Sequence, residues 1–576
     1  VLSSVSRKKD GTGELPNKTM SMGNGDISQG AVPDAVPGQT PHRDVNLQRI
    51  RDRARKLKAD LVDNFESQLQ GIFEDFIEDV EKIEQNGTAN GTKASDGRNG
   101  YKSHDTGHYR QRRPCRHSPS HDYEQGSCLH KKNGELSEKV FITRRSVLTE
   151  LLESSHIRTI YHIFVAILIV FSLNTFVFDL VDTGRVVLDF KLMWWAFGKF
   201  PTVMALWVCM KLSTICIVFP LFQYWASSRP TSRVVWTDYV WLAAYVLYQC
   251  AFMVMPLRML VIYQLPIASS VVVVCEQVRL LMKAHAFVRE NIPRVLAATS
   301  KKDDDAAAEN RNGCPDFSKY LYFLFAPTLV YRDNYPRTPT IRWNYVVTNF
   351  VQTLACIFYI YYIFVRFCVP VFQNFSSEHV TMKALVLASF GCVMPGTLVL
   401  FIGFFAVLHS WLNAFAEMLR FGDRLFYKDW WNSSSFSNYY RTWNVVVHDW
   451  LYSYVYRDCY KLLRVDNRPA NRPAAMASVF LLSAVFHEYI IIVSFGFFYP
   501  VLFFMFAGAG FAFIFLPTKK TRTGNVFMWV ALFLGTGLLM CLYSMEWFAR
   551  KNCPATADSF LDYFIPRSWT CDYTIS

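Results

Sequence analysis

The sequence predicts an all-α, polytopic membrane protein of about nine transmembrane helices, with a polar tail ahead of the first helix. Two observations predict this class. Of the 576 residues, 51% are hydrophobic and 16% are aromatic. The apolar residues also gather in repeated runs of about 20, starting near Ile160, and a run of that length can span a hydrocarbon core of about 30 Å.

Composition divides the tail into three parts. Residues 1–41 are rich in Gly, Ser, Pro and Asn, and are predicted to be disordered. Residues 42–86 carry apolar side chains at steps of three or four, which predicts an amphipathic helix. The repeating positions are Leu57, Leu61, Phe65, Leu69, Ile72, Phe76, Val80 and Ile83. This helix could lie on a surface, but self-association is favoured because its apolar face has no other soluble partner in the tail. Residues 87–140 form a low-complexity linker.

The predicted membrane domain covers residues 141–552 and holds nine apolar runs. These are 159–178, 201–223, 234–255, 258–276, 345–368, 385–415, 475–497, 498–516 and 525–546. Lys and Arg gather on cytoplasmic loops. Eleven of them lie in 277–344, whereas 369–384 has only Lys383 and carries a sequon at Asn374. This predicts a multi-pass protein of the endoplasmic reticulum membrane with a cytosolic N-terminus and a luminal tail, 553–576.

The net charge of +13 does not indicate a nucleic-acid partner. In a membrane protein, basic loops that face anionic membrane lipids account for such a charge. Five Cys and His residues cluster in the N-terminal tail, at Cys115, His117, His121, Cys128 and His130. Their spacing fits no standard zinc pattern, so no metal is expected. Cys553 and Cys571 are candidates for a disulfide if the C-terminal tail faces an oxidising lumen.

Two histidines compete for a chemical role. His487 lies inside an apolar span beside Glu488, where an ionisable group is costly and suggests function by default. The alternative for His487 is a structural hydrogen bond to a neighbouring helix. His448 follows Asn444 by four residues, so the two would share one helix face, and its alternative is packing at the interface. A general base must be neutral, and apolar surroundings favour neutral histidine, so His487 is the preferred base.

The position of such a base indicates its substrate. A base at membrane depth suits an acceptor that also lies in the membrane, such as a lipid hydroxyl. The basic stretch before it contains Arg441, and arginine is well suited to phosphate groups. The residues alone therefore suggest transfer from a phosphate-bearing donor to a lipid acceptor.

Several stretches resemble the membrane-bound O-acyltransferases. They are HSWLNAFAEMLRFGDRLFYKDWWN at 409–432, SNYYRTWNVVVHDWLY at 437–452, SAVFHEY at 483–489 and FLDYFIPRSWTC at 560–571. The forms WNVVVHDW and PRSWTC are similar to the sterol branch of the family. The resemblance covers roughly 140–576, and the N-terminal tail matches poorly. It implies acyl transfer from a long-chain fatty acyl-CoA to the 3β-hydroxyl of cholesterol or a related sterol.

The resemblance also implies roles by position. His487 would be the catalytic base, and Asn444 would donate a hydrogen bond to the acyl carbonyl. Acyl-CoA would contact Asn438, Tyr439, Arg441, Tyr456, Ser483 and Arg472, although four extra residues near 463–472 loosen the alignment at Arg472. Residues that support the reaction chamber would be Trp443, His448 and His409. The wall of the donor site would be formed by Phe426, Tyr427, Asp429, Trp430, Trp431 and Asn432, with Asp429 structural.

The same resemblance implies a disulfide between Cys553 and Cys571, and a dimer or tetramer formed through the N-terminal helix. No cofactor is expected, because acyl-CoA is a cosubstrate. Acylation of another lipid alcohol, such as diacylglycerol, stays open because two of the motifs also occur in diacylglycerol acyltransferases. A transporter with His487 as a proton relay is disfavoured, because the sequence lacks inverted repeats.

Overall fold

The computed structural model describes residues 138–184, 191–229, 233–300, 313–373, 381–463, 471–516, 522–553 and 560–570. The predicted disordered segment 1–41, the helix 42–86, the Asn374 sequon and Cys571 lie outside these ranges. Within them, regular structure is helical, and only two isolated β-bridges interrupt it. The predicted all-α class is therefore confirmed.

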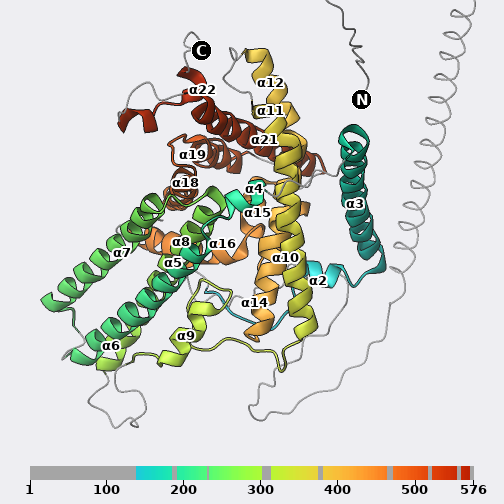
Figure 1. Ribbon diagram of the computed structural model, residues 1–576. Coiled ribbons are helices and arrows are strands. Elements are labelled where there is room, and N and C mark those ends of the chain that lie inside the picture. Colours follow the sequence, from blue (N-terminus) through green and yellow to red (C-terminus); the bar gives the residue numbers. More distant parts are fainter. Residues whose placement is uncertain are drawn as a thin grey trace, which may run out of the picture. The chain divides into compact units, whose positions relative to one another are not determined.

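Seven helical runs in the described part of the chain are long and apolar enough to cross a membrane (Figure 1). Their components are α3 (Ser155–Thr183); α4 (Lys191–Ala196), α5 (Phe200–Ser213), η1 (Thr214–Val218) and α6 (Phe219–Ser228); α7 (Trp236–Ile262); α10 (Trp343–Ile363), η2 (Phe364–Cys368) and α11 (Val369–Phe372); α12 (Met382–Gly391), α13 (Val393–Phe404), η3 (Phe405–Trp411) and α14 (Leu412–Met418); α18 (Arg472–Phe495); and α21 (Arg522–Asn552). Here η1, η2 and η3 are π-helical turns within longer helices.

The count of nine spans is not confirmed by length and composition. The predicted span 258–276 falls on the end of α7 and the start of α8 (Ile267–Ser300). The predicted span 498–516 falls on a shorter apolar helix that is made of α19 (Val501–Phe503), η6 (Phe504–Gly510) and α20 (Phe511–Ile514). The first boundary was misplaced because α7 continues through Pro256, as membrane helices can when neighbouring groups satisfy the freed backbone.

Charged side chains explain why the hydropathy of α8 is too low for α8 to count as a membrane span. Glu276 accepts two hydrogen bonds from Arg279 and forms an ion pair with Lys211 of α5, at 2.9 Å. Lys283 is 1% exposed and donates to the backbone oxygens of Phe323 and Ala326, at the end of α9 (Phe317–Phe325). Buried charge is tolerated when it is paired in this way. These charges lower the hydropathy of α8 although they face protein.

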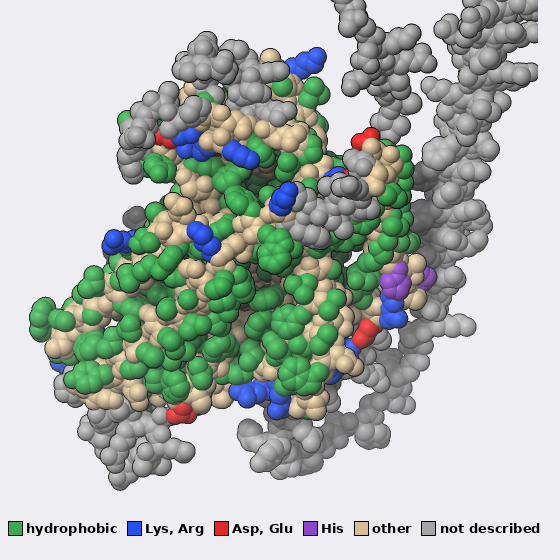
Figure 2. All heavy atoms as spheres, in the orientation of Figure 1, with side chains coloured by type: hydrophobic (Ala, Val, Ile, Leu, Met, Phe, Trp, Pro, Cys, Tyr) green, Lys and Arg blue, Asp and Glu red, His purple; other side chains and the backbone are tan. Residues whose placement is uncertain are grey.

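The outer surface is apolar. Figure 2 shows one face on which hydrophobic side chains form a broad, nearly continuous surface, with Lys and Arg gathered near its edges. Helices α3 and α7 contribute many exposed large side chains, such as Val181 at 81% and Leu247 at 72%. A soluble monomer rarely exposes apolar patches of this extent, so this surface is suited to lipid.

Short helices lie between the spans and at both ends of the set of spans. They are α2 (Val147–Leu151), η4 (Trp430–Asn432), α15 (Phe436–Thr442), α16 (Val445–Leu451), η5 (Tyr452–Tyr456), α17 (Arg457–Leu462), η7 (Phe560–Tyr563) and α22 (Arg567–Thr570). Helix α18 packs against α8, η5, η6 and α17. It ends at Gly496, whose φ of 76° is the left-handed C-cap conformation that glycine adopts without strain.

Candidate active site

Three consecutive residues of α18 have different partners. Glu488 accepts a hydrogen bond from the backbone N–H of Phe503 at 2.9 Å and one from the Tyr543 hydroxyl at 3.2 Å. Tyr489 donates to the Oε1 atom of Gln277 on α8 at 2.8 Å. Glu488 is buried, Tyr489 is half-buried, and His487 is exposed. The neighbours of His487 thus hold α18 to α19, α21 and α8, and His487 itself stays accessible.

The local hydrogen bond of His487 determines its tautomer. Its Nδ1 atom lies 2.7 Å from the backbone oxygen of Ser483, and the Ser483 hydroxyl lies 3.4 Å away. A carbonyl oxygen can only accept, so Nδ1 carries the proton of the neutral ring. The Nε2 atom then keeps its lone pair, as a general base requires. The ring also stacks on Phe506 of η6, with centroids 4.8 Å apart.

Asn444 is the N-cap of α16, and this role orients its amide. Its Oδ1 atom accepts a hydrogen bond from the backbone N–H of Val447 at 3.2 Å. The carbonyl end of the side chain is therefore occupied, and the Nδ2 group remains to donate. The predicted helix over WNVVVHDWLY is present from Val445, and the backbone N–H of His448 donates to Asn444 at 3.0 Å.

The FYKDWWN loop holds the segment that carries Asn444. The backbone N–H of Lys428 donates to Thr442 at 2.8 Å, and the N–H of Val445 donates to Phe426 at 2.9 Å. These two hydrogen bonds lie on either side of Trp443 and Asn444. The motif therefore acts through its backbone, because it fixes where α15 ends and where α16 begins.

Aromatic packing also holds the FYKDWWN loop against Trp443. Trp430 is 1% exposed and its ring lies 4.6 Å from that of Trp443, centroid to centroid. Phe404 of α13 lies 5.1 Å from both rings. Tyr439 is buried in the same cluster, 5.6 Å from Trp443. Trp443 is thus wedged between the motif and a membrane span.

A hydrogen bond from α21 anchors the loop, which gives a testable prediction. The Nδ2 group of Asn525 donates to the backbone oxygens of Trp431 and Ser433, at 2.9 and 2.8 Å. Asn525→Ala removes both bonds and should lower the free energy of unfolding by about 1–3 kcal/mol. Thermal unfolding of the purified protein in detergent measures this. Asn344→Ala, at an exposed position on α10, is the control and should leave the midpoint unchanged; equal shifts for both variants would contradict the anchor.

His409 lies in a buried polar network. It is 5% exposed, and its Nδ1 atom lies 2.7 Å from the Tyr427 hydroxyl and 3.3 Å from the Ser146 hydroxyl. Ser146 and Tyr427 are also 2.8 Å apart, and Asn413 lies 3.4 Å from the same nitrogen. The structure therefore places His409 where it joins the span, the motif loop and the chain before α2.

Helix η6 contacts His487 and also Tyr440, which lies on the segment before Asn444. The hydroxyl of Tyr440, four residues before Asn444, lies 2.6 Å from where a Cβ atom on Gly510 would be. The same Cβ atom would lie 2.9 Å from the backbone oxygen of Met505, so a side chain at this position would force its neighbours to shift. Phe506, one turn before Gly510, is the ring that stacks on His487. Contacts to one turn of η6 thus bring the Asn444 segment towards His487.

Aromatic rings form a ladder along α16, η5 and α17. His448 stacks on Tyr452, Tyr452 on Tyr456, and Tyr456 on Tyr460, with centroids 6.3, 5.6 and 5.9 Å apart. All four side chains are half-buried. His448 Nδ1 also lies 3.5 Å from Asp449. The ladder is a flat, partly exposed aromatic surface that begins one turn after Asn444.

Two arginines predicted to bind acyl-CoA act electrostatically on Tyr456 of this ladder. Burial raises the pKa of Tyr456, and the nearby charges of Arg472 and Arg441 partly oppose that rise. Both arginines are exposed, at the end of α15 and the start of α18. The phenol of Tyr456 and two guanidinium groups therefore share one electrostatic environment, which suits an anion.

The other predicted contacts are spread over this region. Asn438 is exposed and donates to the hydroxyl of Ser433 at 2.9 Å. Ser483 touches His487, whereas Tyr439 is buried in the tryptophan cluster. Asp429 precedes η4 and is half-buried, whereas Asn432 is the last residue of η4 and is exposed. Cys553 follows α21, and Cys571 lies beyond the described residues, so their disulfide stays a prediction.

Sequence reasoning missed several partners. Phe506, Gln277, Tyr543 and Ser146 occur in no motif of the sequence analysis. A lone Gln or Ser in an apolar run is a weak signal, because its partner is distant in sequence and is known only from the fold.

The sequence matches a known family and known proteins. Residues 190–545 match the MBOAT family, the membrane-bound O-acyltransferase family. The chain is 53% identical over 439 residues to sterol O-acyltransferase 1 of Mus musculus, which spans 76% of this chain and 79% of the mouse protein. It is 49% identical over 442 residues to sterol O-acyltransferase 2 of Homo sapiens, which spans 75% of this chain and 80% of the human protein. The chain therefore belongs to the membrane-bound O-acyltransferase family, in the branch of these sterol O-acyltransferases.

Proposed function

We propose that this acyltransferase moves the acyl group of a long-chain fatty acyl-CoA to the 3β-hydroxyl of cholesterol or a related sterol, and so forms a sterol ester. The observation that carries the proposal is an accessible histidine inside a membrane span whose Nδ1 is engaged and whose Nε2 can accept a proton. A base at that depth suits a hydroxyl that reaches it from the bilayer. The identity of about half of the residues to two sterol O-acyltransferases supports the sterol as acceptor.

The reaction then needs three groups. Nε2 of His487 takes the hydroxyl proton as the sterol oxygen attacks the thioester carbonyl carbon. The Nδ2 group of Asn444 donates a hydrogen bond to the oxyanion that forms, and such a donor is typically worth about 10²–10³ in rate. The C–S bond then breaks, and the proton on His487 passes to the leaving CoA thiolate. The products are the ester and free CoA, and His487 is neutral again.

The donor site follows from the aromatic ladder. Arg441 and Arg472 would bind phosphates of acyl-CoA, and the rings from His448 to Tyr460 offer a surface on which the adenine or the pantetheine arm can lie. Ser483, beside His487, would contact the reacting end. Acyl-CoA is a cosubstrate in this scheme, and no cofactor takes part.

Contacts between loops support the orientation in the membrane. On one side, Arg144 donates through its backbone N–H to Gly422, and Arg332 lies 3.8 Å from Glu138. On the other, the N–H of Phe498 donates to Tyr563 at 3.0 Å, and Asn552 donates to Gln373 at 2.9 Å. Loops that touch lie on the same side of a bilayer, so an even number of crossings must separate them.

These contacts favour nine crossings. Three long spans lie between Glu138 and Arg332, so α8 would supply a fourth. Only α21 lies between Phe498 and Tyr563 as a long span, so the shorter helix 501–514 would supply a second. With the basic loops in the cytosol, the N-terminus is cytosolic and the C-terminal tail is luminal, in the endoplasmic reticulum membrane.

Two further proposals concern the ends of the chain. Residues 42–86 would join copies into a dimer or tetramer through their apolar face. Cys553 and Cys571 would form a luminal disulfide. A hydrogen bond from Arg567 to the backbone oxygen of Cys553, at 3.0 Å, supports this pairing, because it holds α22 against Cys553 and Cys571 directly follows α22.

A substrate panel tests the proposed function. Membranes that contain the full chain receive labelled oleoyl-CoA together with cholesterol, other sterols or diacylglycerol, and the esters are separated and counted. Of all the acceptors in the panel, cholesterol should be esterified fastest, so that cholesteryl oleate is the main product. Faster esterification of diacylglycerol than of any sterol would overturn the sterol assignment.

A further inference from the structure

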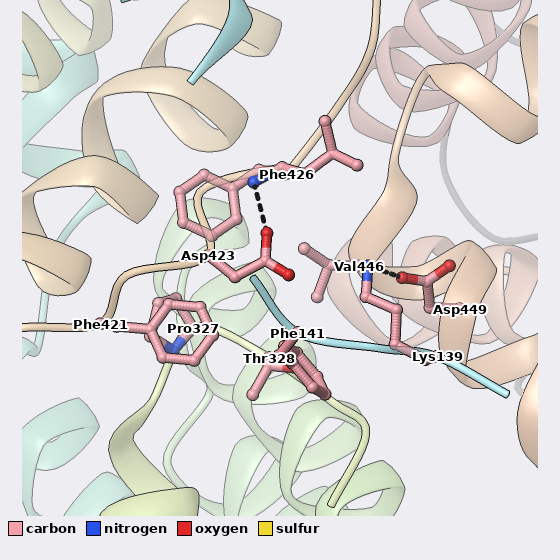
Figure 3. A pocket seen from close by; sticks show the side chains of 10 residues that line it. Lys139, Phe141, Pro327, Thr328, Phe421, Asp423, Phe426, Val446 and Asp449 are labelled. Atoms are coloured by element: carbon pink, nitrogen blue, oxygen red, sulfur yellow. Dashed lines mark hydrogen bonds and ion pairs between the residues drawn. The ribbon is translucent and has the colours of Figure 1, made fainter. Parts of the chain in front are cut away.

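The first described segment of the chain contacts two elements near Asn444 in the sequence, namely the loop at Asp423 and helix α16 at Asp449. We call residues 138–146 the strap. It contacts the loop before FYKDWWN and also reaches α16 (Figure 3). Its side chains alternate for most of its length: Lys139 and Phe141 face the protein, whereas Val140 and Ile142 are 63% and 47% exposed. This burial pattern shows that the strap is docked as an extended segment. It lies outside the residues that match the family, 190–545.

One end of the strap is tied to α16. The Nζ atom of Lys139 lies 2.6 Å from Oδ2 of Asp449, and the two side chains are only 16% and 21% exposed. Burial would raise the pKa of Asp449, but the contacts with His448 and Lys139 outweigh it and hold this pKa below its usual value. Asp449 is therefore ionised at neutral pH, and the ion pair is formed one turn after Asn444.

The other end is tied to the motif loop. Arg144 donates from Nε and Nη2 to both carboxylate oxygens of Asp423, at 2.6 and 3.1 Å. Its backbone N–H donates to Gly422, and its backbone oxygen accepts from Arg424. Two residues further on, Ser146 joins the network of Tyr427. The strap thus connects the loop that grips Asn444 with the helix that Asn444 caps.

A small half-open hollow, with a free volume of about 20 Å³, lies between these two ends. It is lined by Lys139 and Phe141 of the strap and by Phe421, Phe426 and Val446 of the body, among others (Figure 3). Helix α16 continues without a break into η5 and α17, and Trp450 holds its other side by donating from Nε1 to the backbone oxygen of Met282 at 2.9 Å. On the side of the strap, the ion pair between Lys139 and Asp449 restrains the beginning of this helix.

We propose that Lys139 is a positioning residue for acyl transfer, which acts through Asp449 to set the direction in which Asn444 donates. This inference rests on the proposed function. The backbone bonds at Thr442 and Val445 fix the start of α16, and Lys139 fixes its second turn. Without this ion pair the first two turns of the helix lose their restraint on the strap side, and the Nδ2 group shifts from the oxyanion position. Small displacements of this kind, of about 1 Å, can lower rates by up to about 10²-fold.

Kinetics of full-length variants test the inference. Lys139→Ala should lower kcat by about tenfold and change KM for oleoyl-CoA by less, since the lost interaction belongs to the transition state. The exchanged pair Lys139→Asp with Asp449→Lys should recover most of the loss. Arg145→Ala is the matched control. Arg145 neighbours Arg144 in the strap but pairs with Glu153, and both side chains are about 60% exposed, so this variant should keep wild-type kcat.

A double-mutant comparison separates positioning from folding. If Lys139 acts through Asn444, then Lys139→Ala should lower kcat no further in an Asn444→Asp background, because coupled residues are not additive. Independent losses that multiply would overturn the inference, as would a wild-type kcat in Lys139→Ala or a loss explained by less folded protein. If the wild-type chain is active but Lys139→Ala gives one of these contrary results, only the inference about Lys139 fails and the proposed function stands. A wild-type chain inactive with every acceptor would overturn both.

Discussion

Replacing His487 with alanine is expected to lower sterol ester formation by about 10²–10⁴-fold, the range that a positioned general base contributes. The imidazole is the only group of the His487–Glu488–Tyr489 triplet that is exposed, and its Nε2 atom is free because Nδ1 donates to Ser483. Without it, the hydroxyl must attack while it is still protonated. Initial rates with labelled oleoyl-CoA and cholesterol, normalised to folded protein, measure the effect.

The control for this variant is a histidine of another span. His162 lies on α3 and is exposed, so His162→Ala makes the same chemical change in another apolar helix and should retain wild-type activity. Size-exclusion chromatography should show that both variants assemble as the wild-type chain does. Retention of more than a tenth of the activity in His487→Ala would mean that another group accepts the proton.

The second large effect is expected at Asn444, where two roles can be separated. Asn444→Ala removes both the N-cap, worth about 0.5–2 kcal/mol of stability, and the amide donor, worth about 10²–10³ in rate. Asn444→Asp keeps a cap oxygen for the N–H of Val447 but cannot donate when ionised. Both variants should therefore lose activity to a similar extent, whereas only Asn444→Ala should also lose thermal stability. Rates and unfolding midpoints are measured on the same preparations.

Thr381 is the control, because it caps a helix but is not predicted to take part in catalysis. Its side chain accepts a hydrogen bond from the N–H of Ala384 at the start of α12, at 3.2 Å. Thr381→Ala should lower the midpoint about as much as Asn444→Ala and leave kcat unchanged. An active Asn444→Asp enzyme would show that Asn444 serves only as a cap.

Much of the fold could be predicted because hydropathy is a local property. The predicted span 475–497 and the observed α18, Arg472–Phe495, differ by two or three residues at each end. The region around α8 could not be predicted in the same way, because its charges are paired with a lysine on α5 and with backbone oxygens at the end of α9. Those partners are distant in sequence. A hydropathy average over consecutive residues therefore counts the charged side chains of α8 but not the groups that they contact.

The candidate site shows the same division. His487 and Asn444 could be named from an ionisable group in a span and from the motifs, since those signals lie in the sequence itself. The function of FYKDWWN could not be read from its side chains, because the backbone atoms of Phe426 and Lys428 make its main contacts with the Asn444 segment. His409 could be marked as important, but its partners Tyr427 and Ser146 are visible only after folding.

The π-helical turn η5 has a consequence for the shape of the aromatic ladder. In an α-helix of 3.6 residues per turn, side chains four residues apart drift around the axis by about 40° at each step. Four rings in unbroken α-helix would therefore fan out along a spiral. The wider turn of Tyr452–Tyr456 holds more residues than an α-turn, so it rotates the later rings back. The planes of successive rings consequently stay within 11°, 15° and 23° of each other, and the protein presents a straight aromatic rail instead of a twisted one.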